Sequence, residues 1–358
     1  MKNILSILLL AIYLPAIAQL HNPVLPQPQK ISYGNGGFSL KGAAIGFASK
    51  PSAEDKFAAS ELSKLLTKTN TVNVPVKESA TGASIIFERT GNLDPLPVPG
   101  EKTGPGSRES YSIKITPEKI KVTSVSSAGL FYAVQTLRQM IEGTGSRAVI
   151  PVAEIEDWPS MVYRGFMMDM SHFQLPRMEE IKNQIDFMSR WKGNQYLFYS
   201  EASIELDGYP LLMAEARFTK DQVREIINYA KARHVDVIPN MELYGHLHDL
   251  FRLEHYADLA VVPHGGEFIP DDPRVKPLLE DWIGQIAKLF PSPFFHIGFD
   301  ETWLLEHEAK KRNKTPEELY SIMLKQTTDI VEKNGKRAMV WVDMLQKYPA
   351  MIRMHLAG

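Results

Sequence analysis

The chain contains no cysteine among its 358 residues. Disulfide bonds, a thiolate nucleophile and a lipid attached to cysteine are therefore excluded. The chain also has no excess of charge of one sign, because 40 basic side chains stand against 42 acidic ones and leave a net charge of −2. Nothing in that balance favours a nucleic acid or another polyanion as a partner. A hydrophobic content of 44% is ordinary for a globular protein with a sizeable core.

Long apolar runs are also missing, and none is long enough for a membrane-spanning helix. The N-terminal run, residues 4–13, follows a positive Lys2 and precedes the small residues Ala16-Ile17-Ala18. This order is typical of a cleaved signal peptide over residues 1–18, so we expect an exported protein, periplasmic or secreted. An exported protein without disulfides has to rely on a large hydrophobic core.

Residues 19–155 mix strand and helix patterns and predict a small α+β domain. Apolar residues at helical spacing mark residues 52–66 and 128–140 as helices. Apolar and polar residues alternate on both sides of a turn at residues 116–119, which predicts a β-hairpin with one buried face. No group of residues in this region forms a recognisable chemical site, so we expect it to have a structural or positioning role.

Residues 156–358 change to a regular alternation of strands and helices. The predicted strands cover residues 163–168, 195–199, 235–239, 294–299 and 338–342, and capping boxes at Thr219 and Thr315 start two of the helices between them. Alternation of this kind predicts a parallel sheet and an α/β fold of the (β/α)8 TIM-barrel type. Only about five strands can be placed, and a barrel of eight cannot close with five, so we expect a partial, truncated barrel.

Acidic residues follow the carboxyl end of every strand that can be placed. They are Asp169, Glu201, Glu242, Asp300, Glu301 and Asp343. In a barrel these ends meet at one rim, where catalytic groups lie. Aromatic residues accompany them at positions 199, 244, 303 and 341, and a rim of carboxylates and aromatics suits a neutral, polyhydroxylated ligand such as a sugar. Taken alone, Asp300 and Glu301 are equally well explained as a solvated acidic turn after a core strand.

Several segments together resemble glycoside hydrolase family 20, the β-N-acetylhexosaminidases. The segments are residues 163–169, 240–246, 296–301 (His-Ile-Gly-Phe-Asp-Glu) and 339–343 for the catalytic barrel, and residues 128–139 and 150–159 for the small domain that precedes it. The sequence departs from the family pattern at the second strand, where Leu197-Phe198-Tyr199 replaces a His-Trp-His run. It departs again at Tyr244, which replaces a proline, and at Phe299, which replaces a small residue.

The resemblance implies an exo-acting β-N-acetylhexosaminidase that uses a substrate-assisted, retaining mechanism and needs no metal or cofactor. It assigns the general acid/base to Glu301 and the orientation of the 2-acetamido group to Asp300. The remaining expected substrate-binding residues are Arg164, Glu201, His246, Trp341 and Asp343. His296 is expected to support the acidic pair from below. The expected partner is an oligosaccharide or glycoconjugate that contains N-acetylhexosamine; the resemblance does not indicate an oligomeric state.

Two other functions fit parts of the sequence. A metal-dependent hydrolase could use His246, His248 and Asp249 as zinc ligands together with His172 and His264, although this spacing is a weak metal signal. A non-catalytic glycan-binding protein, or an inactive fragment, on the same scaffold is the second alternative. The presence of both Asp300 and Glu301 argues against a purely binding role.

Overall fold

The structure is a computed structural model that describes residues 24–93, 96–171 and 174–351. The predicted signal peptide, residues 1–18, lies outside the described residues, and so does His172. Within the described ranges, no helix combines the length and the apolar character that crossing a bilayer requires.

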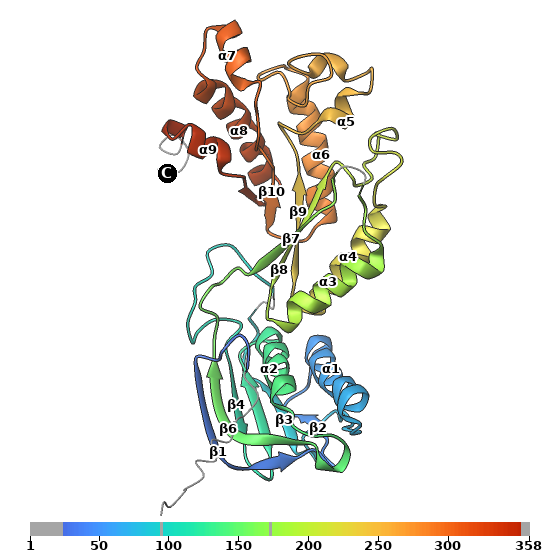
Figure 1. Cartoon of the computed structure of the whole chain (residues 1–358), viewed down its shortest axis with the longest axis vertical. Helices are drawn as coiled ribbons and strands as arrows, with labels where there is room; N and C mark the ends of the chain where they lie inside the picture. Colours follow the sequence, from blue (N-terminus) through green and yellow to red (C-terminus); the bar gives the residue numbers. More distant parts are fainter. Residues whose placement is uncertain (1–23, 94–95, 172–173, 352–358) are drawn as a thin grey trace, which may run out of the picture.

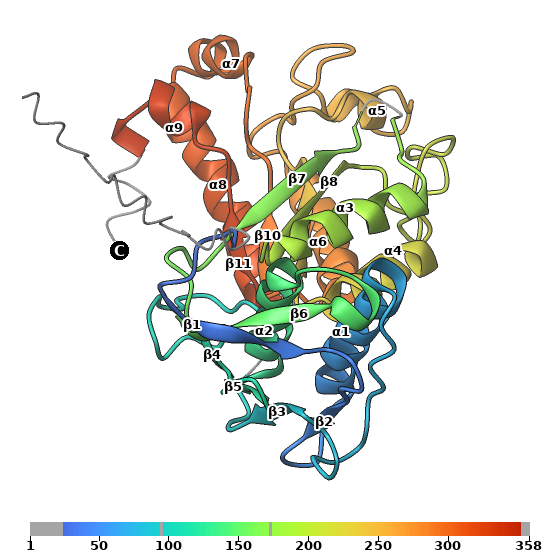
Figure 2. The same ribbon diagram turned by 60° about the horizontal axis from the view of Figure 1, so that its bottom comes forward.

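The small domain is a mixed sheet covered by two helices (Figures 1 and 2). The strands are β1 (Lys30–Ser39), β2 (Ile45–Phe47), β3 (Ile85–Arg89), β4 (Tyr111–Ile115), β5 (Ile120–Ser124) and β6 (Val149–Asp157), arranged in the order β1-β6-β4-β5-β3-β2. The helices are α1 (Ala53–Asn70) and α2 (Ser127–Met140). The predicted hairpin is the antiparallel pair β4–β5. Leu62 and Leu66 on α1 and Leu137 on α2 are fully buried in its core.

The second region is a parallel sheet with helices between its strands. The strands are β7 (Gly165–Asp169), β8 (Gln195–Glu201), β9 (Asp236–Met241), β10 (Phe294–His296) and β11 (Arg337–Met339). The helices are α3 (Met178–Arg190), α4 (Lys220–Lys231), α5 (His248–Phe251), α6 (Val275–Leu289), α7 (Leu305–Arg312), α8 (Pro316–Lys333) and α9 (Asp343–Lys347). The sheet order is β11-β10-β9-β8-β7, so the described strands run in sequence and the barrel is not closed. The predicted fold class, a small α+β domain followed in the chain by a partial α/β barrel, is confirmed.

The fourth and fifth strands are shorter than predicted. Strand β10 ends at His296 instead of Phe299, because Gly298 (φ 74°) and Phe299 (φ 76°) adopt left-handed backbone conformations that leave the strand. Strand β11 ends at Met339 and not at Val342. The two strands stay in register, with His296 opposite Met339. The early end of β10 leaves residues 297–303 as an irregular turn that carries the two adjacent acids.

Candidate active site

Four of the predicted rim acids lie around one tyrosine hydroxyl. Burial raises the pKa of Tyr199, and the negative charges of Glu242, Glu201, Asp300 and Asp169 raise it further. These acids come from the ends of β7 to β10, so the parallel sheet brings together residues that are far apart in the sequence. The prediction that the acids gather at one rim therefore agrees with the structure.

Asp300 and Glu301 both face His246. The Nε2 atom of His246 is 3.4 Å from Asp300 Oδ2 and 3.7 Å from Glu301 Oε2. The Asp300 side chain is 23% exposed, whereas that of Glu301 is 52% exposed. The pair therefore presents one sheltered and one solvent-facing carboxyl, both within reach of the same imidazole.

The three side chains have different protonation tendencies. Burial alone would raise the pKa of Asp300, but the polar contact with His246 Nε2, 3.4 Å away, and the positive charge of that ring outweigh it and lower the pKa. The polar contact with Asp300 raises the pKa of His246, against the opposite effect of burial, and the charges of Asp300, Glu301 and Glu201 add to the rise. The two groups thus stabilise each other as a carboxylate and an imidazolium.

Glu242 lies behind the pair as a fully buried carboxyl group. Burial raises the pKa of Glu242 well above the usual range, and the charge of Asp300 adds to the rise, so its surroundings favour the protonated carboxyl. Asp300 and Tyr199 lie close to it, but neither of its oxygens makes a hydrogen bond of ordinary geometry within the described residues. A Cβ atom at Gly298 would be 2.0 Å from Glu242 Oε2, so only glycine fits there. The sequence predicted that Glu242 lies at the rim, but no pattern in it indicated that the side chain is buried.

Backbone strain is concentrated at this rim. Four non-glycine residues at the ends of the strands have positive φ angles: Glu201 (51°), His246 (54°), Phe299 (76°) and Glu301 (50°). Such conformations cost free energy and are enriched at functional sites. Gly245, which precedes His246, packs so closely on the turn that a Cβ there would be 2.8 Å from the Asp300 carbonyl oxygen. This contact explains the glycine of the Gly-His pair.

Asp343 and Trp341 hold the turn from the neighbouring strand. The Glu301 backbone N–H donates to Asp343 Oδ2 at 3.0 Å, and the Trp341 N–H donates to the Gly298 carbonyl at 3.1 Å. The Trp341 ring packs on His296 with ring centroids 4.5 Å apart. His296 is buried, and burial lowers its pKa to about 4, so it is a neutral support that accepts from the Gly298 N–H. Both predicted residues, Trp341 and Asp343, therefore contact the turn.

Arg164 does not lie with the other predicted site residues. It precedes β7 and is therefore at the amino end of the sheet, whereas the acids follow the carboxyl ends. Its guanidinium pairs with Glu109 of the small domain and donates to the carbonyls of Met161, Val162 and Lys192. The prediction of a sugar-binding role for Arg164 is wrong for this structure, since its donors are already used at the domain junction.

Tyr244 is also excluded from the rim surface. It is fully buried, and its ring packs against Phe299 (5.4 Å between centroids) and Tyr320 of α8 (6.1 Å). Tyr244 and Phe299 are two of the positions at which the sequence departs from the family pattern. The departures therefore contact each other, and Tyr320 completes an aromatic cluster beneath the acidic turn, with its hydroxyl donating to the Phe299 carbonyl at 2.9 Å.

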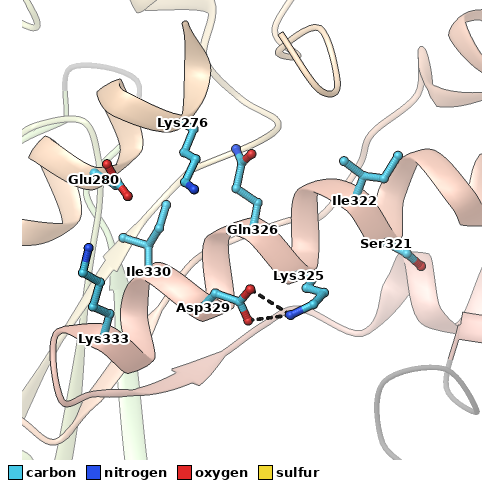
Figure 3. A pocket seen from close by; sticks show the side chains of 9 residues that line it. All are labelled: Lys276, Glu280, Ser321, Ile322, Lys325, Gln326, Asp329, Ile330 and Lys333. Atoms are coloured by element: carbon cyan, nitrogen blue, oxygen red, sulfur yellow. Dashed lines mark hydrogen bonds and ion pairs between the residues drawn. The ribbon is translucent and has the colours of Figure 1, made fainter. Parts of the chain in front are cut away.

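Two other regions of the chain carry side chains that could bind a ligand. Within the described residues, no group of three or more histidine, aspartate or glutamate side chains is placed to hold a metal ion. Asp249 instead accepts from the Met213 N–H at 2.9 Å. A surface groove of about 670 Å³ lies between α6 and α8 (Figure 3). Its lysines and acids are mixed, and Lys325 is paired with Asp329 at 2.8 Å, so it offers no charge of one sign to a ligand.

A parallel βα sheet with an ionised and an adjacent exposed carboxyl at its carboxyl edge is typical of glycoside hydrolases. A family model described as the catalytic domain of glycosyl hydrolase family 20 matches residues 161–356, and one described as domain 2 of that family matches residues 21–158. The chain belongs to glycosyl hydrolase family 20, and the resemblance seen in the sequence is confirmed.

Relatives and solved structures agree with this assignment. The β-hexosaminidase of Porphyromonas gingivalis is 31% identical over 288 residues, which cover 68% of this chain and 36% of the relative. That of Akkermansia muciniphila is 26% identical over 275 residues, covering 66% and 55%. The chitobiase of Flavobacterium johnsoniae has the same fold, with a TM-score of 0.77 at 23% identity over 89% of this chain and 52% of that one. The N-acetyl-β-hexosaminidase of Streptomyces plicatus has a TM-score of 0.73 at 25% identity, over 90% and 66%. The matched region spans about a third of the Porphyromonas gingivalis relative and about half of the Akkermansia muciniphila relative.

Proposed function

We propose that the protein is an exo-acting β-N-acetylhexosaminidase. It removes terminal N-acetyl-β-hexosamine residues from oligosaccharides or glycoconjugates and, given the signal-peptide pattern of residues 1–18, acts outside the cytoplasm. Membership of family 20 and the relatives named β-hexosaminidase support this substrate class. The observation that carries the proposal is the arrangement of Asp300, kept ionised by His246, beside the exposed Glu301.

In the first step, the oxygen of the substrate's own 2-acetamido group attacks the anomeric carbon. Glu301 donates its proton to the glycosidic oxygen, the bond between that oxygen and the anomeric carbon breaks, and the leaving sugar departs as an alcohol. The half-exposed position of Glu301 supports this role, because the carboxyl can reach a bond at the surface of the rim.

The intermediate is an oxazolinium ring with a positive charge. An ionised Asp300 can accept a hydrogen bond from the acetamido N–H and stabilise that charge as it develops. In the second step, the Glu301 carboxylate removes a proton from water, which attacks the anomeric carbon and reopens the ring with overall retention. Glu301 ends the cycle protonated again, so no proton is lost or gained.

Two substitutions test the assignment on an aryl N-acetyl-β-hexosaminide. Glu301→Gln is expected to abolish turnover, and Asp300→Ala to lower kcat by about two to three orders of magnitude, as for other lost transition-state hydrogen bonds. Glu118→Gln, an exposed position in the β4–β5 turn, is the control and should leave turnover unchanged. Circular dichroism verifies that each variant is folded. A wild-type rate in Glu301→Gln would refute the proposal, and sugar binding by the wild type without turnover would favour a glycan-binding protein.

A further inference from the structure

Trp303 is an exposed aromatic side chain directly beside the acidic pair. It lies two residues beyond Glu301 and its side chain is 64% exposed, whereas its neighbour Thr302 is buried. A single exposed apolar residue is not informative by itself. The position of this one is informative, because the leaving group of a glycosidase has to lie on the side of the general acid.

The backbone around Trp303 is fixed on both sides. Its N–H donates to the Glu301 carbonyl at 2.9 Å, and the next N–H, of Leu304, donates to Oε1 of the buried Glu267 at 2.8 Å. The indole therefore stands on a held turn and not on a free loop. Binding of a ligand that stacks on the indole therefore has only a small entropic cost from ordering of the protein.

Helix α9 connects the acid to the indole. The helix begins at Asp343, which accepts from the Glu301 N–H, and ends at Lys347, whose Nζ lies over the Trp303 ring at 5.7 Å from the centroid. Lys347 approaches the ring as a cation–π partner, and the large exposed fraction of Trp303 leaves much of the ring open to solvent.

Lys347 connects the indole to two further polar groups that suit a sugar. Glu306 of α7 is paired with Lys347 at 3.0 Å and accepts from the Tyr348 hydroxyl at 2.7 Å. Both helices lie beside α8 in Figure 1. An aromatic face with a carboxylate, an ammonium and a phenol at its side can stack on a pyranose and hydrogen-bond its hydroxyls.

We propose that Trp303, with Glu306, Lys347 and Tyr348, forms the subsite for the leaving sugar. The inference rests on the proposed function and narrows its substrate class. It identifies the natural substrates as N-acetylhexosamine residues linked to another sugar, which Trp303 recognises by stacking. Small leaving groups gain nothing from this surface.

The test compares two leaving groups in wild type and Trp303→Ala. The substrates are the β-1,4-linked disaccharide of N-acetylglucosamine and the β-azide of N-acetylglucosamine, whose leaving group is too small to reach the indole. Loss of the stacking contact should lower kcat/KM for the disaccharide by about tenfold, mainly through KM, because the contact is made before and during the reaction. Turnover of the azide should not change, and Trp303→Phe should recover part of the loss. Equal losses on both substrates, or no loss on either, would overturn the proposal.

A binding measurement separates this inference from the proposed function. In a Glu301→Gln background, the disaccharide should bind more tightly than the monosaccharide, and adding Trp303→Ala should remove that difference. The matched control is Trp191→Ala, because Trp191 lies at the end of α3 and is 44% exposed. This substitution should leave the preference for the disaccharide unchanged. If the wild type hydrolyses neither substrate but the preference depends on Trp303, the proposed function fails and the subsite stands. A preference unaffected by Trp303→Ala refutes the subsite.

Discussion

The pKa values of two neighbouring carboxyl groups at the rim, Asp300 and Glu242, shift in opposite directions because their surroundings differ. Contact with His246 lowers the pKa of Asp300, whereas burial against Gly298, without a well-formed hydrogen bond among the described residues, raises the pKa of Glu242. A proton on Glu242 removes the repulsion that two carboxylates would exert on each other at this distance. The environment, and not the residue type, therefore decides which acid can stabilise a positive charge.

Glu267 provides a measurable case of the same effect. It is 5% exposed, and burial raises its pKa to about 7, although its backbone hydrogen bonds and the charge of His246 oppose the rise. Between pH 4.5 and 7 the folded state binds more protons than the unfolded state, so stability falls as the pH rises through this window. The wild type should lose about 3 kcal/mol of unfolding free energy across this pH window, and Glu267→Gln should not show that loss.

The measurement is the free energy of unfolding by denaturant at several pH values from 4 to 8. Because the side-chain amide of the Glu267→Gln variant keeps an acceptor for the Leu304 N–H, a change in slope reports the lost proton binding and not a lost hydrogen bond. Glu332→Gln, on the exposed side of α8, is the control and should leave the pH profile unchanged. An identical profile in wild type and Glu267→Gln would contradict the assignment.

Helix α8 supports the acidic turn through the aromatic cluster. Its Thr315 and Glu318 form a capping box that starts the helix, and one turn later Tyr320 packs on Phe299 and Tyr244. A bulky Phe299 in the turn is accommodated because Tyr244 and Tyr320 enclose it. The element thus couples the outer helix layer to the conformation of residues 299–301.

Removing the Tyr320 hydroxyl should affect both stability and turnover. In Tyr320→Phe, the buried carbonyl of Phe299 loses its donor, at a cost of about 1–3 kcal/mol for an unsatisfied buried group. Thr315→Ala should cost about 1 kcal/mol by removing the helix cap without touching the turn. We therefore expect kcat to fall in Tyr320→Phe and to stay constant in Thr315→Ala when both are assayed under folding conditions. Equal kcat values in the two variants would show that α8 contributes stability alone.

Local patterns predicted most of the architecture of the whole molecule. All five strands of the second sheet, the hairpin β4–β5 and the capping boxes at Thr219 and Thr315 follow from periodicity and cap residues, which depend on neighbours in the sequence. The convergence of the acids at one rim followed from the alternation of strands and helices. The early end of β10 did not, because its left-handed turn depends on the fit of Gly298 against Glu242 from another strand.

Contacts between segments that are distant in the chain could not be predicted from local sequence patterns. The family resemblance assigned Arg164 to the sugar, and its actual partner, Glu109, lies 55 residues away in a region where the sequence indicated no site. A second buried cluster also joins the two domains, and no local sequence pattern predicts it. It consists of Lys192, Asp157 and Tyr111. The junction between the domains thus contains buried ion pairs and hydrogen bonds, which link the two sheets.

This junction leads to a prediction about the whole molecule. Lys192 is 6% exposed, and its Nζ lies 2.7 Å from Asp157 Oδ2 and 2.8 Å from the Tyr111 hydroxyl. Lys192→Met should lower the free energy of unfolding by about 3–5 kcal/mol, because it leaves the Asp157 carboxylate buried without its cation. Adding Asp157→Asn removes that charge and should recover part of the loss. Lys114→Met, in the exposed pair with Glu154, is the matched control and should change nothing measurable. Equal effects of Lys192→Met and Lys114→Met in denaturant unfolding would show that the buried pair does not hold the domains together.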